Sequence, residues 1–181
     1  MAKTMWDAST PPASPPAGYD AAAGYIGGDT PHVWTPGEWR RLGTLPKLPI
    51  WVRSNPPASA GAARAQAHSD AFAAIEQLYR IGARPGSTVA LDLETAISPV
   101  YVGAFNDVMR WDGWHVWPYG SRSTVFSNPA CAGYWIADYT GVPHMVAGAQ
   151  VRATQWTDGA LFDKSVVKWW SWRRRLWRLG S

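Results

Sequence analysis

Two acidic side chains two residues apart, Asp92 and Glu94, are the strongest candidates for chemistry in this sequence. Successive side chains of a strand point to opposite faces, so both carboxyls would lie on one face of the apolar segment Ser87–Glu94. Two close carboxyls raise the pKa of one of them, as a general acid working near neutral pH requires. The alternative, which the common Asp-x-Glu pattern alone favours, is a strand end that binds loop amides or an arginine.

Two further acids stand at the ends of the predicted strand series. Asp7 ends the first predicted strand, and Asp163 follows the last one. Each alone fits an aspartate that caps a loop. If the strands close into a ring, the first and last strands become neighbours, and these two acids join Asp92 and Glu94 in one acidic centre. At the carboxyl end of parallel strands, such a centre would occupy the usual place of a barrel active site.

The elements that must position these acids alternate between strands and helices, which predicts a mainly parallel sheet. Thr35-Pro36-Gly37-Glu38 is a capping box with proline at the first helical position, so a short helix should begin there. We expect strands over Lys3–Ser9, Ala23–Gly27, Leu48–Arg53, Ser87–Glu94, Trp114–Tyr119, Tyr134–Tyr139 and Val151–Trp156. We expect helices over Pro36–Leu42 and Ser59–Ile81, and a third one starting at Ser98-Pro99. Loops alone should join the closing strands.

Apolar residues at helical spacing predict the buried faces of the two longer helices. The first face is expected to comprise Phe72, Ile75, Leu78 and Tyr79. The second is expected to comprise Val102, Phe105, Val108 and Met109.

The composition suits one globular domain with a sizeable core, because 46% of the 181 residues are hydrophobic and 17% are charged. The net charge of +4 comes from the C-terminal end, where six basic residues and no acidic one follow Phe162–Asp163. The rest of the chain carries about −2, so we do not expect a nucleic acid as partner. We divide the chain into a body, 1–167, and a basic, Trp-rich tail, 168–181.

Several other functions lack their sequence signals. Cys131 is the only cysteine, so it has no intramolecular disulfide partner and is expected to be a small buried residue. The four histidines lack the spacing of a zinc site, and we expect neither a metal nor a cofactor. The start of the sequence lacks a signal-peptide pattern, and no apolar run reaches the roughly 18 residues of a membrane span.

Four short motifs occur in the order seen in the lysozymes of glycoside hydrolase family 25. They are Met5-Trp6-Asp7-Ala8-Ser9, Asp92-Leu93-Glu94, Tyr134-Trp135-Ile136-Ala137-Asp138-Tyr139, and Gln155-Trp156-Thr157 followed by Asp163. The runs Ile81–Ser87 and Trp117–Ser121 also resemble related glycoside-hydrolase-like domains of actinobacteria and their phages. The resemblance covers roughly Met5 to Val167. The chain is shorter than a typical family 25 lysozyme, and a Pro-rich stretch follows Asp7 in place of the family's continuation of that strand.

The resemblance implies an α/β fold, a compact TIM-like (β/α) barrel that lacks some helices in its C-terminal part. It also implies a muramidase-like activity on the glycan strands of peptidoglycan. By that likeness Glu94 would protonate the leaving glycosidic oxygen, and Asp92 would stabilise positive charge or position the sugar's acetamido group. Asp7 and Asp163 would complete the acidic cup. The alternative is the same barrel without strong catalysis, used as a cell-wall-binding or structural component of a phage tail.

Polar and aromatic residues near the predicted strand ends could line a glycan cleft, because sugar faces stack on aromatic rings. The candidates for substrate binding are Tyr25, Tyr119, Trp135, Tyr139, Gln155 and Trp156. Aromatic residues in strands more often pack a core, so we expect only two or three of the rings to touch a ligand.

The tail, 168–181, combines tryptophans with arginines and lysine. As a helix it would bind a membrane surface or an anionic wall polymer, or dock its Trp face on the barrel or on another protein, such as a virion component. The missing signal peptide favours a phage protein, carried in the virion or released to the cell wall.

Overall fold

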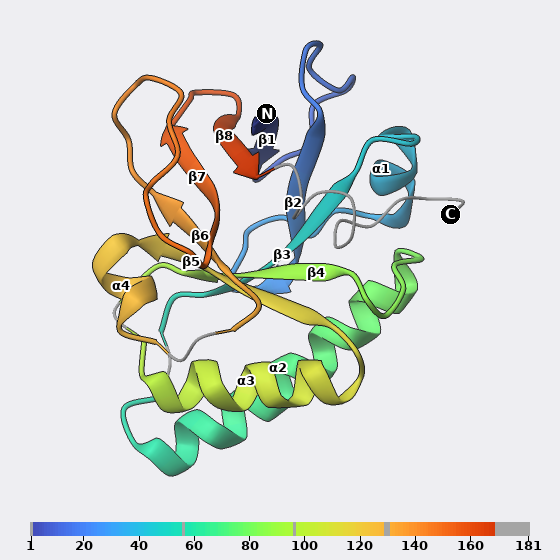
Figure 1. Cartoon of the computed structure of the whole chain (residues 1–181). Coiled ribbons are helices and arrows are strands. Elements are labelled where there is room, and N and C mark those ends of the chain that lie inside the picture. The colour runs from blue at the N-terminus through green and yellow to red at the C-terminus, as the bar shows by residue number, and fades with distance from the viewer. Residues whose placement is uncertain (1, 56, 96, 129–130, 169–181) are drawn as a thin grey trace.

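The computed structural model describes residues 2–55, 57–95, 97–128 and 131–168 (Figure 1). Its strands form a closed barrel in which each strand pairs with the next in sequence and the last pairs with the first. The strands are β1 (Ala2–Ala8), β2 (Ala21–Gly28), β3 (Lys47–Arg53), β4 (Thr88–Leu93), β5 (His115–Ser121), β6 (Tyr134–Ala137), β7 (Val151–Thr157) and β8 (Asp163–Lys168). The helices are α1 (Pro36–Arg41), α2 (Ala60–Arg80), α3 (Pro99–Trp111) and α4 (Arg122–Phe126). The predicted α/β barrel with few helices is confirmed.

The barrel is closed by β8, a strand that the sequence pattern did not reveal. The prediction that Asp163 follows the last strand was wrong, because Asp163 begins β8. This strand runs antiparallel to both β7 and β1, whereas β1 to β7 are parallel to one another. Its first residue therefore lies at the end of the barrel where β1 ends, and Asp163 pairs in register with Asp7. The expected meeting of these two acids is confirmed, through an antiparallel strand.

Alternation along the strands separates an inner core from an outer one. Val89, Leu91 and Leu93 of β4 face outward into the cluster that includes the helices, and Ala90 faces into the barrel, as the sequence predicted. Many inward positions are alanine, which suits the narrow interior of a small barrel. The inner cluster comprises Met5, Ala21, Ala23, Leu48, Ile50, Val52, Ala90, Trp117, Trp135, Ala153 and Val167.

Helices α2 and α3 cover one side of the barrel and lie against each other there, whereas α1 and α4 lie elsewhere around it (Figure 1). The predicted face of α3 is confirmed for Val102, Phe105 and Met109, which are fully buried. The predicted face of α2 was largely wrong, since Phe72 is 57% and Tyr79 50% exposed. Alanines bury α2 instead, because small side chains let its backbone approach its neighbours closely. These buried residues are Ala63, Ala67, Ala71, Ala74 and Leu78.

Local signals explain where the helices begin. The Thr35 hydroxyl accepts a hydrogen bond from the Glu38 amide, and the Glu38 carboxylate accepts one from the Thr35 amide, so the predicted capping box is confirmed. Ser121 caps α4, a five-residue helix that was not predicted. As expected, loops alone join β6 to β7 and β7 to β8 within the described residues. No helix in the described part is both long and apolar enough to cross a membrane.

Gly24 of β2 yields a test of the outer packing. A Cβ at this position would lie 2.6 Å from the ring of Trp34, which packs against Trp6 and Trp39. We expect Gly24→Ala to lower the free energy of unfolding by about 2 kcal/mol, since overpacking a tight core is destabilising. Thermal or urea unfolding measures this difference.

The matched control is Gly61→Ala in the first turn of α2, where an added Cβ meets nothing within 4 Å. It should leave the stability unchanged or raise it by up to about 1 kcal/mol, because alanine is the better helix former. Equal effects of the two substitutions would show that the Trp34 ring does not constrain Gly24.

Candidate active site

The inward face of the barrel carries its polar residues at one end, one step beyond the inner apolar core. Asp7 follows Met5 by two residues, and Asp92 follows Ala90 by two. The same step places Tyr25, Tyr119 and Gln155 after inner-core residues of β2, β5 and β7. Because parallel strands end at the same edge, these side chains meet at the carboxyl end of the barrel. Register irregularities at Tyr25/Gly27 and Gln155/Thr157 lie at this end, as bulges beside functional sites often do.

Asp92 and Asp7 are carboxyls buried at this end, each only 3% exposed. Burial, reinforced by the neighbouring charge of Glu94, raises the pKa of Asp92 to about 8. Burial also raises the pKa of Asp7 well above its ordinary value, with further contributions from Asp163, Asp92 and Asp158. One oxygen of Asp7, Oδ2, is buried without a hydrogen-bond partner. Asp92 is thus poised to hold a proton near neutral pH, and the pKa of Asp7 is shifted in the same direction.

Asp163 and Glu94 complete the predicted set of acids. Asp163 is partly buried and accepts a hydrogen bond of 2.8 Å from the Gly159 amide, and burial raises its pKa. Glu94 stands just past the end of β4 and is exposed. Its charge acts on Asp92 and on Tyr25, which places it beside the buried acids. The structure thus brings all four predicted acids together.

Two hollows of about 250 and 200 Å³ open beside these carboxyls. Glu94, Asp29 and Ser54 line the larger one, and Asp7 and Asp163 line the smaller. Ser9 and Tyr25 line both, so the hollows meet there. Glu94 and Asp7 therefore line adjoining parts of one depression, whereas Asp92 lines neither hollow.

Asp158 is a further acid of the smaller hollow that the sequence reasoning missed. It follows β7 directly, and its charge raises the pKa of both Asp7 and Asp163. Its position after the strand Gln155-Trp156-Thr157 was the signal that could have revealed it.

The predicted aromatic residues differ in exposure: Tyr139 is exposed, whereas Trp135 is buried beneath Tyr119. The Tyr119 hydroxyl donates a hydrogen bond of 2.5 Å to Gln155 Oε1 and lies 3.1 Å from the Tyr139 hydroxyl. Tyr139 is 56% exposed, whereas Trp135 is 1% exposed and lies under Tyr119 with its ring centre 4.5 Å away. Trp135 Nε1 donates to Ser165 Oγ at 3.0 Å.

Tyr25 and Trp156 are both partly exposed. Tyr25 lines both hollows, and Lys164 Nζ lies 5.6 Å from the centre of the Trp156 ring. Tyr25 is therefore positioned to meet a molecule that enters the depression, whereas Trp156 lines neither hollow.

No basic side chain in the described ranges forms an ion pair with any of the four predicted carboxylates. Arg53, which ends the neighbouring strand β3, pairs with Asp29 and Asp70 instead. Within those ranges, the alternative interpretation finds no support in its arginine form at Asp92 and Glu94. Repulsion between neighbouring carboxylates raises the pKa of Asp7 and of Asp92 in addition to burial.

The fold that carries this site also occurs in solved structures of other proteins. No protein-family model matches the chain, and a search of curated proteins finds no match. An uncharacterised protein of B. stearothermophilus superposes with a TM-score of 0.74 at 14% identity, over 96% of this chain and 99% of that one. The catalytic domain of the endolysin ply40, from bacteriophage P40 of Listeria monocytogenes, has a TM-score of 0.69 at 14% identity, over 93% and 94% of the two chains.

A third structure belongs to a protein whose enzyme family is named. It is GHIP, a glycosyl hydrolase 25 of Streptococcus pneumoniae, with a TM-score of 0.62 at 11% identity, over 93% of this chain and 88% of that one. The chain has the fold of the family 25 lysozyme-like barrels. At this level of identity the likeness establishes the fold, and the chemistry has to be argued from the chain's own side chains.

The raised pKa of Asp92 predicts how stability depends on pH. A group whose pKa is higher in the folded than in the unfolded state stabilises the fold fully below its unfolded value, near 3.8, and loses that contribution as pH rises through about 8. We expect Asp92→Asn, which stays neutral, to melt about 5 °C or more above the unsubstituted protein at pH 8.5. At pH 4 the two should melt nearly together.

Asp107→Asn, at an exposed position of α3, is the control and should leave the pH dependence unchanged. Scanning calorimetry between pH 4 and 9 measures the three curves. A constant offset between Asp92→Asn and the unsubstituted protein would contradict a proton held on Asp92.

Proposed function

We propose that the protein is a peptidoglycan hydrolase that cleaves glycan strands in the manner of a muramidase. One arrangement carries the proposal: Asp92, a carboxyl whose pKa burial raises to about 8, stands two residues before Glu94, an exposed carboxyl that lines an open hollow. Glycosidases use a pair of carboxyl groups that flank the scissile bond, one of them with a raised pKa. The fold shared with an endolysin catalytic domain and a glycosyl hydrolase 25 supports the substrate class.

In the proposed mechanism the proton stored on Asp92 is delivered through Glu94. A bound sugar excludes water from the carboxyl pair, and the proton then passes from Asp92 to Glu94. Glu94 then donates this proton to the leaving glycosidic oxygen as the bond between that oxygen and the anomeric carbon breaks. Asp92, now an anion, stabilises the positive charge that develops on the sugar ring. A water molecule adds its oxygen to the anomeric carbon and returns a proton to the carboxyl pair.

The remaining predicted residues would hold the glycan in place. Asp7 and Asp163 add negative potential around the positively charged sugar. Tyr25 would contact the chain where the two hollows meet, and Tyr139 and Trp156 offer partly exposed rings for stacking. Tyr119 and Gln155 fix one another through their hydrogen bond, and Trp135 supports Tyr119 from below.

A second candidate function is a wall-binding or structural barrel without catalysis. It is favoured by the deep burial of Asp7 and Asp92, which limits direct contact with a ligand. Co-sedimentation with insoluble peptidoglycan, without release of reducing sugar, would support this function over hydrolysis.

The phage endolysin among the structural neighbours fits a place of action at the bacterial cell wall, and we propose that context for this chain. Carriage in a virion, and binding of a membrane or protein by the tail, are further proposals. The tail's first residue, Lys168, ends β8, and its other residues, 169–181, lie outside the described part of the chain.

Glu94→Gln tests the proposed activity. The amide keeps the shape of the side chain but holds no transferable acid proton, so release of reducing sugar from purified peptidoglycan should fall at least about 100-fold. Glu76→Gln, at an exposed position of α2, is the matched control and should retain full activity. Equal activity of Glu94→Gln and the unsubstituted protein would remove Glu94 from the mechanism.

The pH dependence of kcat/KM tests the role of Asp92, because this ratio reports groups of the free enzyme. Since the protonated form is the active one, activity should decline as pH rises through about 8. Soluble peptidoglycan fragments are the substrate. A basic limb that persists unchanged in Asp92→Asn would assign that limb to another group.

A further inference from the structure

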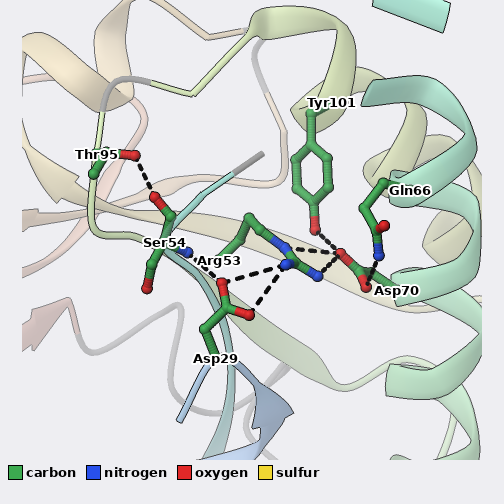
Figure 2. A network of polar contacts seen from close by, with 7 residues as sticks. All are labelled: Asp29, Arg53, Ser54, Gln66, Asp70, Thr95 and Tyr101. Carbon is green, nitrogen blue, oxygen red and sulfur yellow. Dashed lines mark hydrogen bonds and ion pairs between the residues drawn. The ribbon is translucent and has the colours of Figure 1, made fainter. Parts of the chain in front are cut away.

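A polar network lies beside the acidic centre, between the barrel and helices α2 and α3 (Figure 2). At its middle is Arg53, the last residue of β3, whose side chain is 13% exposed. Its guanidinium donates to Asp70 of α2 through Nε and Nη2, and to both oxygens of Asp29 through Nη1, at 3.1 and 3.3 Å. Two carboxylates on different elements therefore hold this arginine from opposite sides.

Asp70 is held in turn by both helices. Its carboxylate accepts hydrogen bonds from the Tyr101 hydroxyl of α3 at 2.6 Å and from Gln66 Nε2 of α2 at 2.9 Å. Asp70 is 5% exposed, and a buried carboxylate with this many donors has little freedom to move. The arginine at the end of β3 is thereby anchored to the helical layer.

The other side of the network reaches the residues that carry the proposed proton donor. The Arg53 carbonyl accepts a hydrogen bond from the Glu94 amide at 3.4 Å, and the Ser54 carbonyl accepts one from the Thr95 hydroxyl at 2.6 Å. The Ser54 amide donates to Asp29 at 2.7 Å. Ser54, Asp29 and Glu94 all line the larger hollow. The bound Arg53 side chain thus holds the backbone of Arg53 and Ser54 in place. The carbonyls of these two residues in turn bind Glu94 and Thr95.

We propose that Arg53 is a positioning residue, which fixes Glu94 against the substrate through the Arg53 and Ser54 carbonyls and Thr95. This inference rests on the proposed role of Glu94. Glu94 lies beyond the last residue of β4, where a long backbone hydrogen bond of 3.4 Å from its amide to the Arg53 carbonyl continues the strand ladder, and its side chain is exposed. A proton donor has to lie within hydrogen-bond reach of the leaving oxygen, and a shift of about 1 Å can cost up to roughly 100-fold in rate.

A merely structural tie between β3 and α2 would have other consequences. It would affect the free energy of unfolding, and it would leave the catalytic constants of the folded protein unchanged. The Thr95 hydroxyl separates these cases, because Thr95 is exposed and lies at the Glu94 end of the network.

Two variants test the proposal, with kcat and KM measured on soluble peptidoglycan fragments. Thr95→Val removes the hydroxyl at nearly constant shape, and Arg53→Lys keeps the charge but loses the forked contact to Asp70 and Asp29. We expect each to lower kcat about tenfold or more with KM changed less than about twofold. Thr95→Ser should restore kcat. Tyr79→Phe, which removes a helix-surface hydrogen bond to Asp112 at 3.0 Å, should retain it.

A second measurement does not depend on catalysis. Amide hydrogen exchange at Glu94 should accelerate at least about tenfold in both Thr95→Val and Arg53→Lys. Exchange at Thr95 should accelerate likewise in Arg53→Lys, and exchange at Leu91 within β4 should not change in either variant. Unchanged exchange together with unchanged kcat in Thr95→Val would overturn the proposal. Failure of the proposed function differs from this result, because Glu94→Gln would then be as active as the unsubstituted protein.

Discussion

The antiparallel pairing of β8 with β7 and β1 is the constraint on which the site depends. Seven parallel strands leave an open edge on each side, and β8 closes both edges with one short segment. Because it runs against its neighbours, it starts where they end. An aspartate at its first position thereby meets the aspartate near the end of β1, although 156 residues separate them in sequence. A parallel eighth strand would need a long crossover to reach the same end.

Closure also creates the electrostatic character of the site. The barrel interior excludes water from Asp7 and Asp92, and no lysine or arginine in the described residues is paired with them. Such carboxyls destabilise the fold when they are charged, so they retain protons at a pH where exposed carboxyls have lost them. The arginine nearest along the sheet edge, Arg53, is bound by two other aspartates. The positive charge of Arg53 is therefore neutralised by Asp29 and Asp70 rather than by the carboxyls of the acidic centre.

The sequence predicted those features that depend on local chemistry. The capping box at Thr35 and the alternation along Val89–Glu94 specify their structures through neighbouring residues, and both agree with the structure. The convergence of strand ends in a ring also predicted that Asp7 and Asp163 would meet, although Asp163 proved to begin a strand. The strand β8 was missed because Asp163-Lys164-Ser165-Val166-Val167-Lys168 has only two apolar residues, and its pairing partners are distant in sequence. The face of α2 was misjudged because the largest apolar side chains stood out, whereas close packing selected alanines.

The network around Arg53 could not be derived from the sequence, because it depends on five segments that meet only in the folded barrel. Its residues come from the bend after β2, from β3 and the residue after it, from α2, from α3 and from the turn after β4. No spacing rule connects Asp29, Asp70 and Thr95 before the topology is known. Individually each is an ordinary polar residue of a helix or a loop.

The direction of β8 also decides where the two described ends of the chain emerge. Lys168 pairs in register with Ala2, at the pole of the barrel opposite the carboxylates. Anything joined to either residue therefore begins at the side away from the depression. A label or an immobilising surface attached at Ala2 would thus start at the end of the barrel opposite the hollows that Asp7 and Glu94 line.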